Sequence, residues 1–224
     1  MISINNTIIL YKDMRYSDFK NKIQGFPIFS SSLSGCLDSN EQLLRNQLSS
    51  WKKRGLILEL KRGLYVLNEN DRKINPSRVF LANQLYSPSY ISTEYALMLY
   101  NLIPERVVDV TSVTTRKTKS FKNACGLFVY QHIASGCFRD FIDQKDENNY
   151  SFFIATPEKA MVDFIYLNLA RFKENQLDIF EQSFRFQNYA GLDVSKMLGA
   201  ARLFKSKKLL NVIEMFCQLI KKSD

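Results

Sequence analysis

One stretch, residues 38–67, constrains the fold more than any other part of the chain. Its sequence is DSNEQLLRNQLSSWKKRGLILELKRGLYVL, a helical pattern followed at once by two short apolar runs. Leu44, Leu48 and Trp51 recur at i, i+4 and i+7, which predicts one buried stripe along a helix of roughly four turns. Gly55 is suited to end that helix. The stretch therefore predicts an amphipathic helix that leads directly into a hairpin.

The two apolar runs, LILEL and LYVL, predict strands joined by a tight turn that contains Gly63. Upstream, residues 16–22 predict a short helix. Phe29 and the serine run after it predict a second short helix, with Phe29 as the stapling residue. Helix, helix, helix and two-stranded hairpin is the element order of a winged helix-turn-helix.

A polar segment at 68–77, NENDRKINPS, predicts a linker after the hairpin. We therefore expect a winged helix-turn-helix domain over residues 1–70 and a second domain over residues 71–224. The second part mixes helical and strand patterns, so the expected fold class of the whole chain is α+β.

The second part opens with two predicted helices, at 77–86 and 93–101, the latter with Ser92 as a candidate cap. Strands are expected in VVDVTSVTT, GLFVYQHI and YSFFIA, and RKTKSFKN is expected to be a basic loop. In TPEKAMVDFIYLNLARF, Thr156 and Pro157 predict the start of a buried central helix. Two further helices end the chain, the last over about residues 206–222.

The charge distribution favours an acidic partner. The chain has 31 Lys and Arg against 22 Asp and Glu, a net charge of +9. Residues 1–75 hold 12 basic and 7 acidic residues, an excess of 5, whereas residues 76–224 hold 19 and 15, an excess of 4. Nucleic acid is the commonest partner of such a surface, although a basic surface alone can also be only a soluble one.

The predicted winged helix supplies side chains suited to DNA. At about 100° per residue, the face opposite the buried stripe is polar and basic. Its short amide and hydroxyl side chains are suited to base edges, and its cations to phosphates or guanine. Two more cations lie at the tip of the wing, where a phosphate or a narrow minor groove would lie. The DNA-binding residues we predict are Gln42, Arg45, Asn46, Ser49, Lys52, Lys53, Lys61 and Arg62.

Motifs for common chemistry are missing from the sequence. It has no GxxxxGK[ST] or GxGxxG phosphate loop and no GxSxG elbow. The one histidine, His132, lies among aromatic residues, where a packed or surface role is commoner than catalysis. The four cysteines form no CxxC pair, so neither zinc nor a disulfide framework is expected. Asp163 lies in an apolar helical pattern and needs a buried partner. We expect no enzyme activity, no metal and no cofactor.

Three segments in a fixed order carry a family resemblance. WKKRGLILELKRGLYVL, then YISTEYALMLYNLIPE, then ATPEKAMVDFIYL resemble the AbiEi-type antitoxins of bacterial type IV toxin–antitoxin and abortive-infection systems. The likeness spans residues 16–172. The sequence departs from the family pattern at SSSLSGCL, a poor helix former.

The resemblance implies a winged helix that binds and represses the operon's own promoter, and a C-terminal domain that counteracts a nucleotidyltransferase toxin. It implies no catalytic residue. Double-stranded DNA and the cognate toxin, contacted directly or indirectly, are the expected partners, and a homodimer on DNA is left open. The resemblance places Arg62 and Gly63 in the wing, Ser92, Glu94 and Ala96 in the first helix of the antitoxin domain, and Pro157, Glu158, Lys159 and Asp163 in its central helix.

Two other interpretations stay open at this level. The chain can be a stand-alone winged-helix transcriptional regulator whose C-terminal domain senses a ligand or dimerises, or a nuclease that uses Glu158 and Lys159. For the toxin contact, the first candidates are the cations of the expected basic loop, with a solvated loop as the plainer explanation. These cations are Arg116, Lys117, Lys119 and Lys122.

The sequence also bears on localisation. No apolar run approaches the length of a membrane span, and the first 16 residues contain only a four-residue apolar run, IILY. We expect a cytoplasmic protein with no membrane partner.

Overall fold

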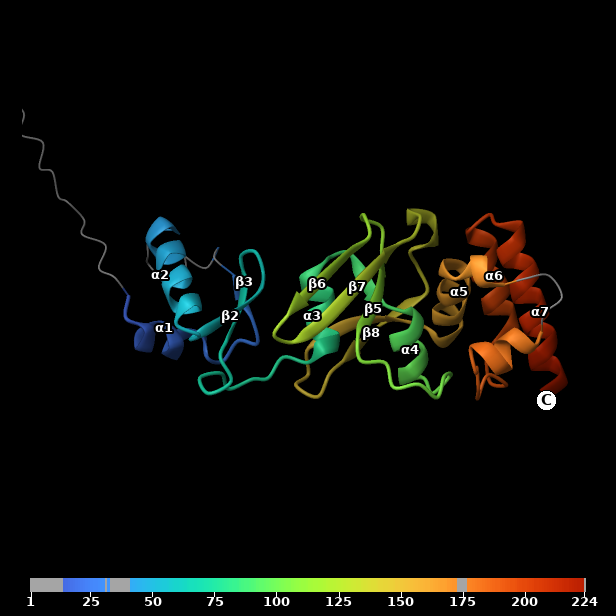
Figure 1. Cartoon of the computed structure of the whole chain (residues 1–224), viewed down its shortest axis with the longest axis horizontal. Helices are drawn as coiled ribbons and strands as arrows, with labels where there is room; N and C mark the ends of the chain where they lie inside the picture. The colour runs from blue at the N-terminus through green and yellow to red at the C-terminus, as the bar shows by residue number, and fades with distance from the viewer. Residues whose placement is uncertain (1–13, 31, 33–40, 173–176, 224) are drawn as a thin grey trace, which may run out of the picture. The chain divides into compact units, whose positions relative to one another are not determined.

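The protein is described from a computed structural model, which describes residues 14–30, 32, 41–172 and 177–223. The chain divides into two compact units, Met1–Pro76 and Ser77–Asp224 (Figure 1). The division falls inside the segment expected to be a linker, but later than residue 70. The reason is that the first half of this segment folds onto the first unit, where Asp71 accepts hydrogen bonds from Tyr16 at 2.7 Å and Lys20 at 3.1 Å.

The first unit contains helices α1 (Tyr16–Ile23) and α2 (Glu41–Lys53) and strands β1 (Phe29–Ser30), β2 (Ile57–Lys61) and β3 (Leu64–Leu67). The strands form an antiparallel sheet in the order β1-β3-β2. The expected helix at 16–22, the amphipathic helix and the hairpin are confirmed.

The second predicted helix does not begin where the sequence predicts it, because Phe29 and Ser30 form strand β1. Phe29 lies in strand β1 opposite Tyr65, and its ring packs on the rings of Phe19 and Tyr65 at centroid distances of 5.3 and 5.8 Å. An aromatic side chain suits a pleated strand, and here packing against two elements outweighs the local capping pattern. Residue 31 and residues 33–37 of the predicted helix lie outside the described residues.

The core of the first unit includes the predicted buried face of α2. Leu44, Leu48 and Trp51 are buried together with Phe19 of α1. Two glycines shape the path after α2, since Gly55 has φ +70° at the end of the helix and Gly63 has φ +79° in the hairpin turn. Both angles lie in the left-handed region that glycine adopts without strain.

The second unit is built on a six-stranded mixed sheet in the order β6-β7-β5-β4-β9-β8. The pairs β5–β7 and β4–β9 are parallel and the other pairs are antiparallel. The strands are β4 (Ser89–Ile91), β5 (Val110–Thr114), β6 (Lys119–Asn123), β7 (Gly126–His132), β8 (Phe141–Lys145) and β9 (Ser151–Ala155).

Three strands of this sheet were not predicted. The expected basic loop contains β6, and β4 and β8 were missed as well. The edge strands β6 and β8 pair on one side only and carry mostly exposed polar residues, so they lack the apolar alternation that marks a strand. Strand β4 has only three residues, too few to show a period.

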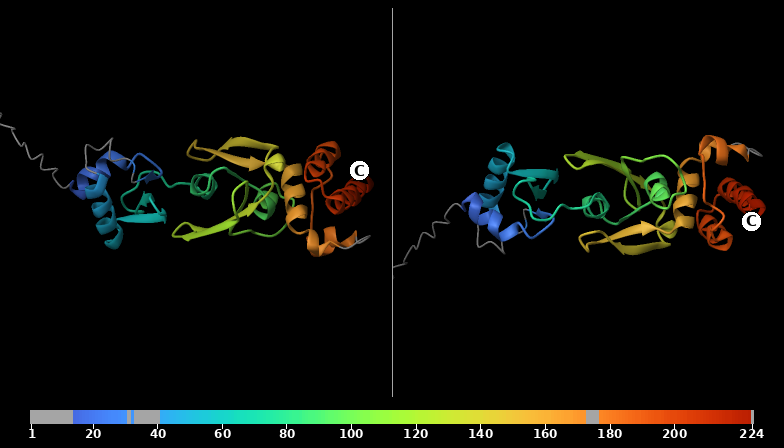
Figure 2. Two further views of the ribbon diagram at one scale, coloured as in Figure 1. Left: turned by 90° about the horizontal axis from the view of Figure 1, so that it is seen from above. Right: turned by 90° about the horizontal axis from the view of Figure 1, so that it is seen from below.

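Helices α3 (Arg78–Leu85), α4 (Thr93–Leu99), α5 (Pro157–Leu167), α6 (Val194–Leu203) and α7 (Lys207–Ser223) complete this unit, with short helical turns at Ser135–Cys137, Leu169–Arg171 and Ile179–Ser183. Figure 2 shows α5 between the sheet and the pair α6 and α7. Thr156 caps α5 by accepting a hydrogen bond from the Lys159 amide, and Pro157 is its first residue, as predicted. None of the helices in the described part of the chain combines the length and apolar character needed to cross a membrane.

Candidate functional site

The exposed face of α2 lies where the sequence predicts it. All six predicted side chains on this helix are exposed, because they lie opposite Leu44, Leu48 and Trp51. Two pairs along the helix are already connected. The amide of Gln42 donates to Asn46 at 3.1 Å, and Arg45 forms an ion pair with Glu41 at 2.6 Å. The polar groups are therefore partly ordered on the helix surface.

An ion pair joins this face to the hairpin. Lys52 donates to the Glu59 carboxylate of β2 at 2.6 Å, and this bond raises the pKa of Lys52. At the tip of the hairpin, Arg62 is exposed, whereas Lys61 is half-buried and has interactions of its own. The structure therefore brings Lys52 of α2 into contact with the strand that leads to the two wing cations.

The four cations predicted for a partner contact are all exposed but lie in different settings. Arg116 stacks over the ring of Tyr86 at 4.4 Å and donates to the carbonyl of Ser87 at 3.1 Å. Lys119 lies 4.9 Å from the centre of the Phe121 ring. Lys119 and Lys122 lie on edge strand β6, whereas Arg116 and Lys117 lie in the loop before it. The segment expected to be one basic loop is therefore part loop and part edge strand.

A buried polar cluster lies where α5 meets the sheet. Asp163 is fully buried, forms an ion pair with Lys159 one turn earlier, and accepts hydrogen bonds from the hydroxyls of Tyr90 at 3.0 Å and Ser92 at 2.9 Å. Burial raises the pKa of Asp163, while Lys159 and the two hydroxyls oppose that rise. The buried partner that Asp163 was expected to need is therefore Lys159.

The expectation that the Ser92 side chain caps α4 is wrong. This side chain makes no capping bond to α4, because it donates to Asp163 instead. The next residue, Thr93, is buried with φ +55°, an unusual conformation for a β-branched side chain, and its hydroxyl has no hydrogen-bond partner.

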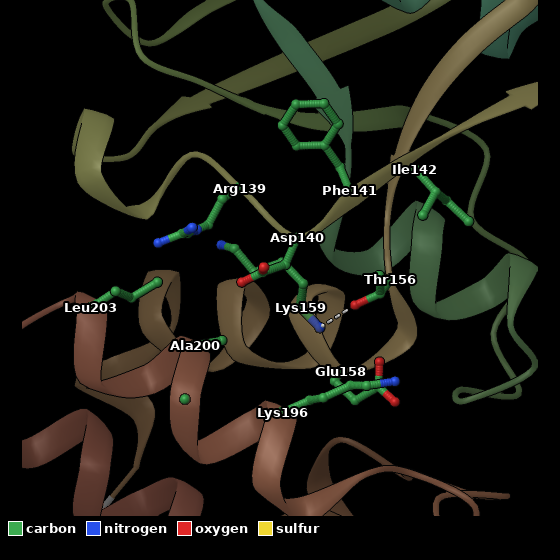
Figure 3. A pocket seen from close by; sticks show the side chains of 11 residues that line it. Arg139, Asp140, Phe141, Ile142, Thr156, Glu158, Lys159, Lys196, Ala200 and Leu203 are labelled. Atoms are coloured by element: carbon green, nitrogen blue, oxygen red, sulfur yellow. Dashed lines mark hydrogen bonds between the residues drawn. The ribbon is translucent and has the colours of Figure 1, made fainter.

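A pocket of about 550 Å³ opens beside the first turn of α5. Figure 3 shows Arg139 and Leu203 at one end and Glu158 and Lys196 at the other, with Asp140 between them. The loop before β8, the start of α5 and one side of α6 all contribute. The residues around it are Arg139, Asp140, Phe141, Ile142, Thr156, Glu158, Lys159, Lys196, Gly199, Ala200 and Leu203. Sequence reasoning missed this pocket, because its three segments are far apart along the chain.

The groups considered for other chemistry are engaged in structural contacts. Lys159 is fully buried and paired with Asp163, and Glu158 is nine-tenths buried and accepts a hydrogen bond from the Asp193 amide at 3.3 Å. His132 is exposed, and its ring nitrogen lies 3.0 Å from the carbonyl of Arg116.

Metal ligands and cysteines offer no further site in the part of the chain that the structure describes. No group of three or more His, Cys, Asp or Glu side chains is placed there to hold a metal ion. No disulfide joins the described cysteines, Cys125, Cys137 and Cys217, and Cys36 lies outside the described residues.

Comparison with known proteins adds no relative. No protein-family model matches the chain, and a search of curated proteins finds no match.

Proposed function

We propose that the protein is a DNA-binding antitoxin that represses its own operon and counteracts a nucleotidyltransferase toxin. The observation that carries the DNA-binding part is the exposed polar and basic face of α2, joined by the Lys52–Glu59 ion pair to a hairpin with a basic turn. The order α1, β1, α2, β2, β3, with all three strands in one sheet, supports a winged helix.

In this proposal α2 enters the major groove. Gln42, Asn46 and Ser49 contact base edges, and Arg45, Lys52 and Lys53 contact phosphates or guanine. Lys61 and Arg62 contact the backbone or the minor groove from the wing. Lys52 and Arg45 exchange their carboxylate partners Glu59 and Glu41 for phosphates, a small cost because ion pairs near the protein surface contribute little to stability.

The antitoxin part of the proposal is supported by the resemblance of two segments, YISTEYALMLYNLIPE and ATPEKAMVDFIYL. These segments meet in space, since Tyr90 and Ser92 from the first donate to Asp163 from the second. This contact gives a physical reason for the two patterns to occur together in one fold. It also assigns Tyr90, Ser92 and Asp163 to the core rather than to the surface that would meet a toxin. For that surface we propose the basic edge formed by Arg116, Lys117, Lys119 and Lys122.

A second candidate function is a stand-alone transcriptional regulator with a ligand-sensing C-terminal domain. The pocket beside α5 favours it, because a cavity of about 550 Å³ lies within the range of small-molecule sites. Both functions share the DNA-binding unit. The identity of the adjacent gene separates them, since a neighbouring nucleotidyltransferase gene is expected only for an antitoxin.

The deciding experiment measures binding to the DNA upstream of the protein's own gene and to random duplexes of equal length. The native chain should prefer the upstream DNA. Asn46→Ala and Arg45→Ala should each reduce that preference, because a bidentate base contact carries about 1–3 kcal/mol of discrimination. Asn70→Ala, an exposed change in the same unit, serves as the control. Equal affinity of the native chain for both DNAs would rule out operator recognition. Equal loss on both DNAs in the variants would limit these residues to backbone contacts.

A further inference from the structure

The pocket beside α5 presents charges of both signs. Arg139 and Lys196 supply two cations, and Asp140 and Glu158 supply two carboxylates. Within the described residues, the side chains of Arg139 and Asp140 form no hydrogen bond or ion pair with the protein, and both are exposed. Asp140 holds φ +61°, a backbone conformation that few residue types other than glycine tolerate. Arg139 and Asp140 therefore present two opposite charges to the same cavity, and neither side chain forms a hydrogen bond or ion pair with the described part of the protein.

Apolar side chains also line this pocket. Phe141 and Ile142 follow Asp140 on β8, and Ala200 and Leu203 of α6 line the pocket with them. Ile142 is 42% exposed, a high fraction for an isoleucine beside a concave surface. Figure 3 shows that Arg139 and Leu203 lie at the same end of the pocket. A ligand at this end would meet a guanidinium, a carboxylate and aliphatic carbon.

We propose that this pocket binds a free aliphatic amino acid as its zwitterion. The α-carboxylate pairs with Arg139, whose planar guanidinium binds carboxylates through two parallel hydrogen bonds. The α-ammonium group pairs with Asp140, and the aliphatic side chain covers Ala200 and Leu203. A ligand with a single charge would pair with one of these two groups and leave the other partly desolvated and unpaired, which is unfavourable. The site is independent of DNA binding and goes beyond the proposed function.

A larger side chain in place of Gly199 should fill the pocket without disturbing the fold. Gly199 lines the pocket from α6, and a Cβ atom at this position would meet no atom within 4 Å. A leucine there would extend into the cavity, and leucine is also a better helix former than glycine. Gly191→Leu is the matched control, because Gly191 is equally open but is not among the residues that line the pocket.

The test is isothermal titration of the full chain, without DNA, with L-leucine and two analogues. Leucinamide lacks the carboxylate, and 4-methylpentanoate lacks the ammonium group. Leucine should bind, and each analogue should bind about two- to fivefold more weakly, since each loses one ion pair with an exposed side chain of the pocket. Gly199→Leu should abolish binding and Gly191→Leu should retain it.

Charge variants test the same contacts if Gly199→Leu does not fold. Arg139→Gln and Asp140→Asn change exposed side chains and should each weaken leucine binding about two- to fivefold. Arg202→Gln, an exposed change on α6 that is not among the lining residues, should have no effect. No heat of binding with leucine, equal binding of all three compounds, or unchanged binding in the pocket variants would overturn the proposal. These outcomes are independent of DNA recognition, so they leave the antitoxin proposal untouched and bear only on the ligand-sensing alternative.

Discussion

At the scale of single residues, Lys159 is a fully buried charge in the second unit. Its ammonium group pairs with Asp163 and lies 4.9 Å from the centre of the Phe204 ring. A buried ion pair contributes little net stability compared with apolar residues of the same size, but loss of one partner leaves the other charge uncompensated.

We therefore expect Lys159→Met to reduce the free energy of unfolding by about 3–5 kcal/mol. Urea denaturation followed by circular dichroism measures this change. Lys208→Met, at an exposed position on α7, should change it by less than about 0.5 kcal/mol. Adding Asp163→Asn to Lys159→Met should restore part of the loss, because the unpaired carboxylate is then gone. A mild effect of Lys159→Met alone would show that water or a neighbouring group compensates Asp163.

Asp71 links the stability of the first unit to pH. The hydroxyl of Tyr16 and the ammonium of Lys20 donate to its carboxylate and hold its pKa below the ordinary value of 3.8. A lowered pKa in the folded state means that this contribution is fully present above about pH 4 and is lost as the pH falls through the folded value. Asp71→Asn should therefore destabilise the unit by about 1–3 kcal/mol at pH 7, and by less below pH 4.

Fluorescence of Trp51, the single tryptophan, reports unfolding of the unit that contains Asp71. Asp18→Asn is the matched control, since Asp18 is exposed on α1. A loss of the same size at pH 3 and pH 7 would exclude the carboxylate charge as the cause.

At the scale of elements, local signals predicted the helices and strands whose patterns are complete within the sequence. Helix α2 has a full apolar stripe, and α5 has a threonine cap followed by proline. Strands β1, β4, β6 and β8 have no such signal, because their pairing partners, not their own residues, determine them. The local sequence predicts that the Ser92 side chain caps a helix. Its hydroxyl instead donates a hydrogen bond to Asp163, which is distant in the sequence.

The hairpin carries the next prediction. Replacing Lys61 and Arg62 together by alanine should weaken binding to all DNA sequences and should reduce the slope of log K against log salt by roughly two, because about one unit is lost for each phosphate contact. The measurement is a salt titration of duplex affinity. Lys207→Ala with Lys208→Ala removes the same charge from α7 in the other unit and should leave the slope unchanged. An unchanged slope in the hairpin variant would remove the wing from DNA binding.

At the scale of the whole molecule, the limits of sequence reasoning follow from distance along the chain. The exposed face of α2 was predictable, because one helical period determines it. The Lys52–Glu59 contact and the pocket beside α5 were not, because each joins different elements. The division after Pro76 lies within the predicted linker but later than residue 70 for the same reason, since Asp71 belongs to the first unit through its contacts with α1.

The division after Pro76 leads to the last prediction, that repression and protection from the toxin separate. A fragment of residues 77–224 retains the six-stranded sheet, α5 and its buried cluster, and is large enough to bury a core without the first unit. It should fold, fail to repress, and still protect cells that express the cognate nucleotidyltransferase toxin. The measurement is growth under co-expression, with the fragment's folding checked by circular dichroism. The fragment with Lys159→Met is the matched control and should be less stable and protect less well. Growth arrest despite a folded native fragment would mean that protection requires DNA binding or the intact chain, and the assignment of the antitoxin role to the second unit would be wrong.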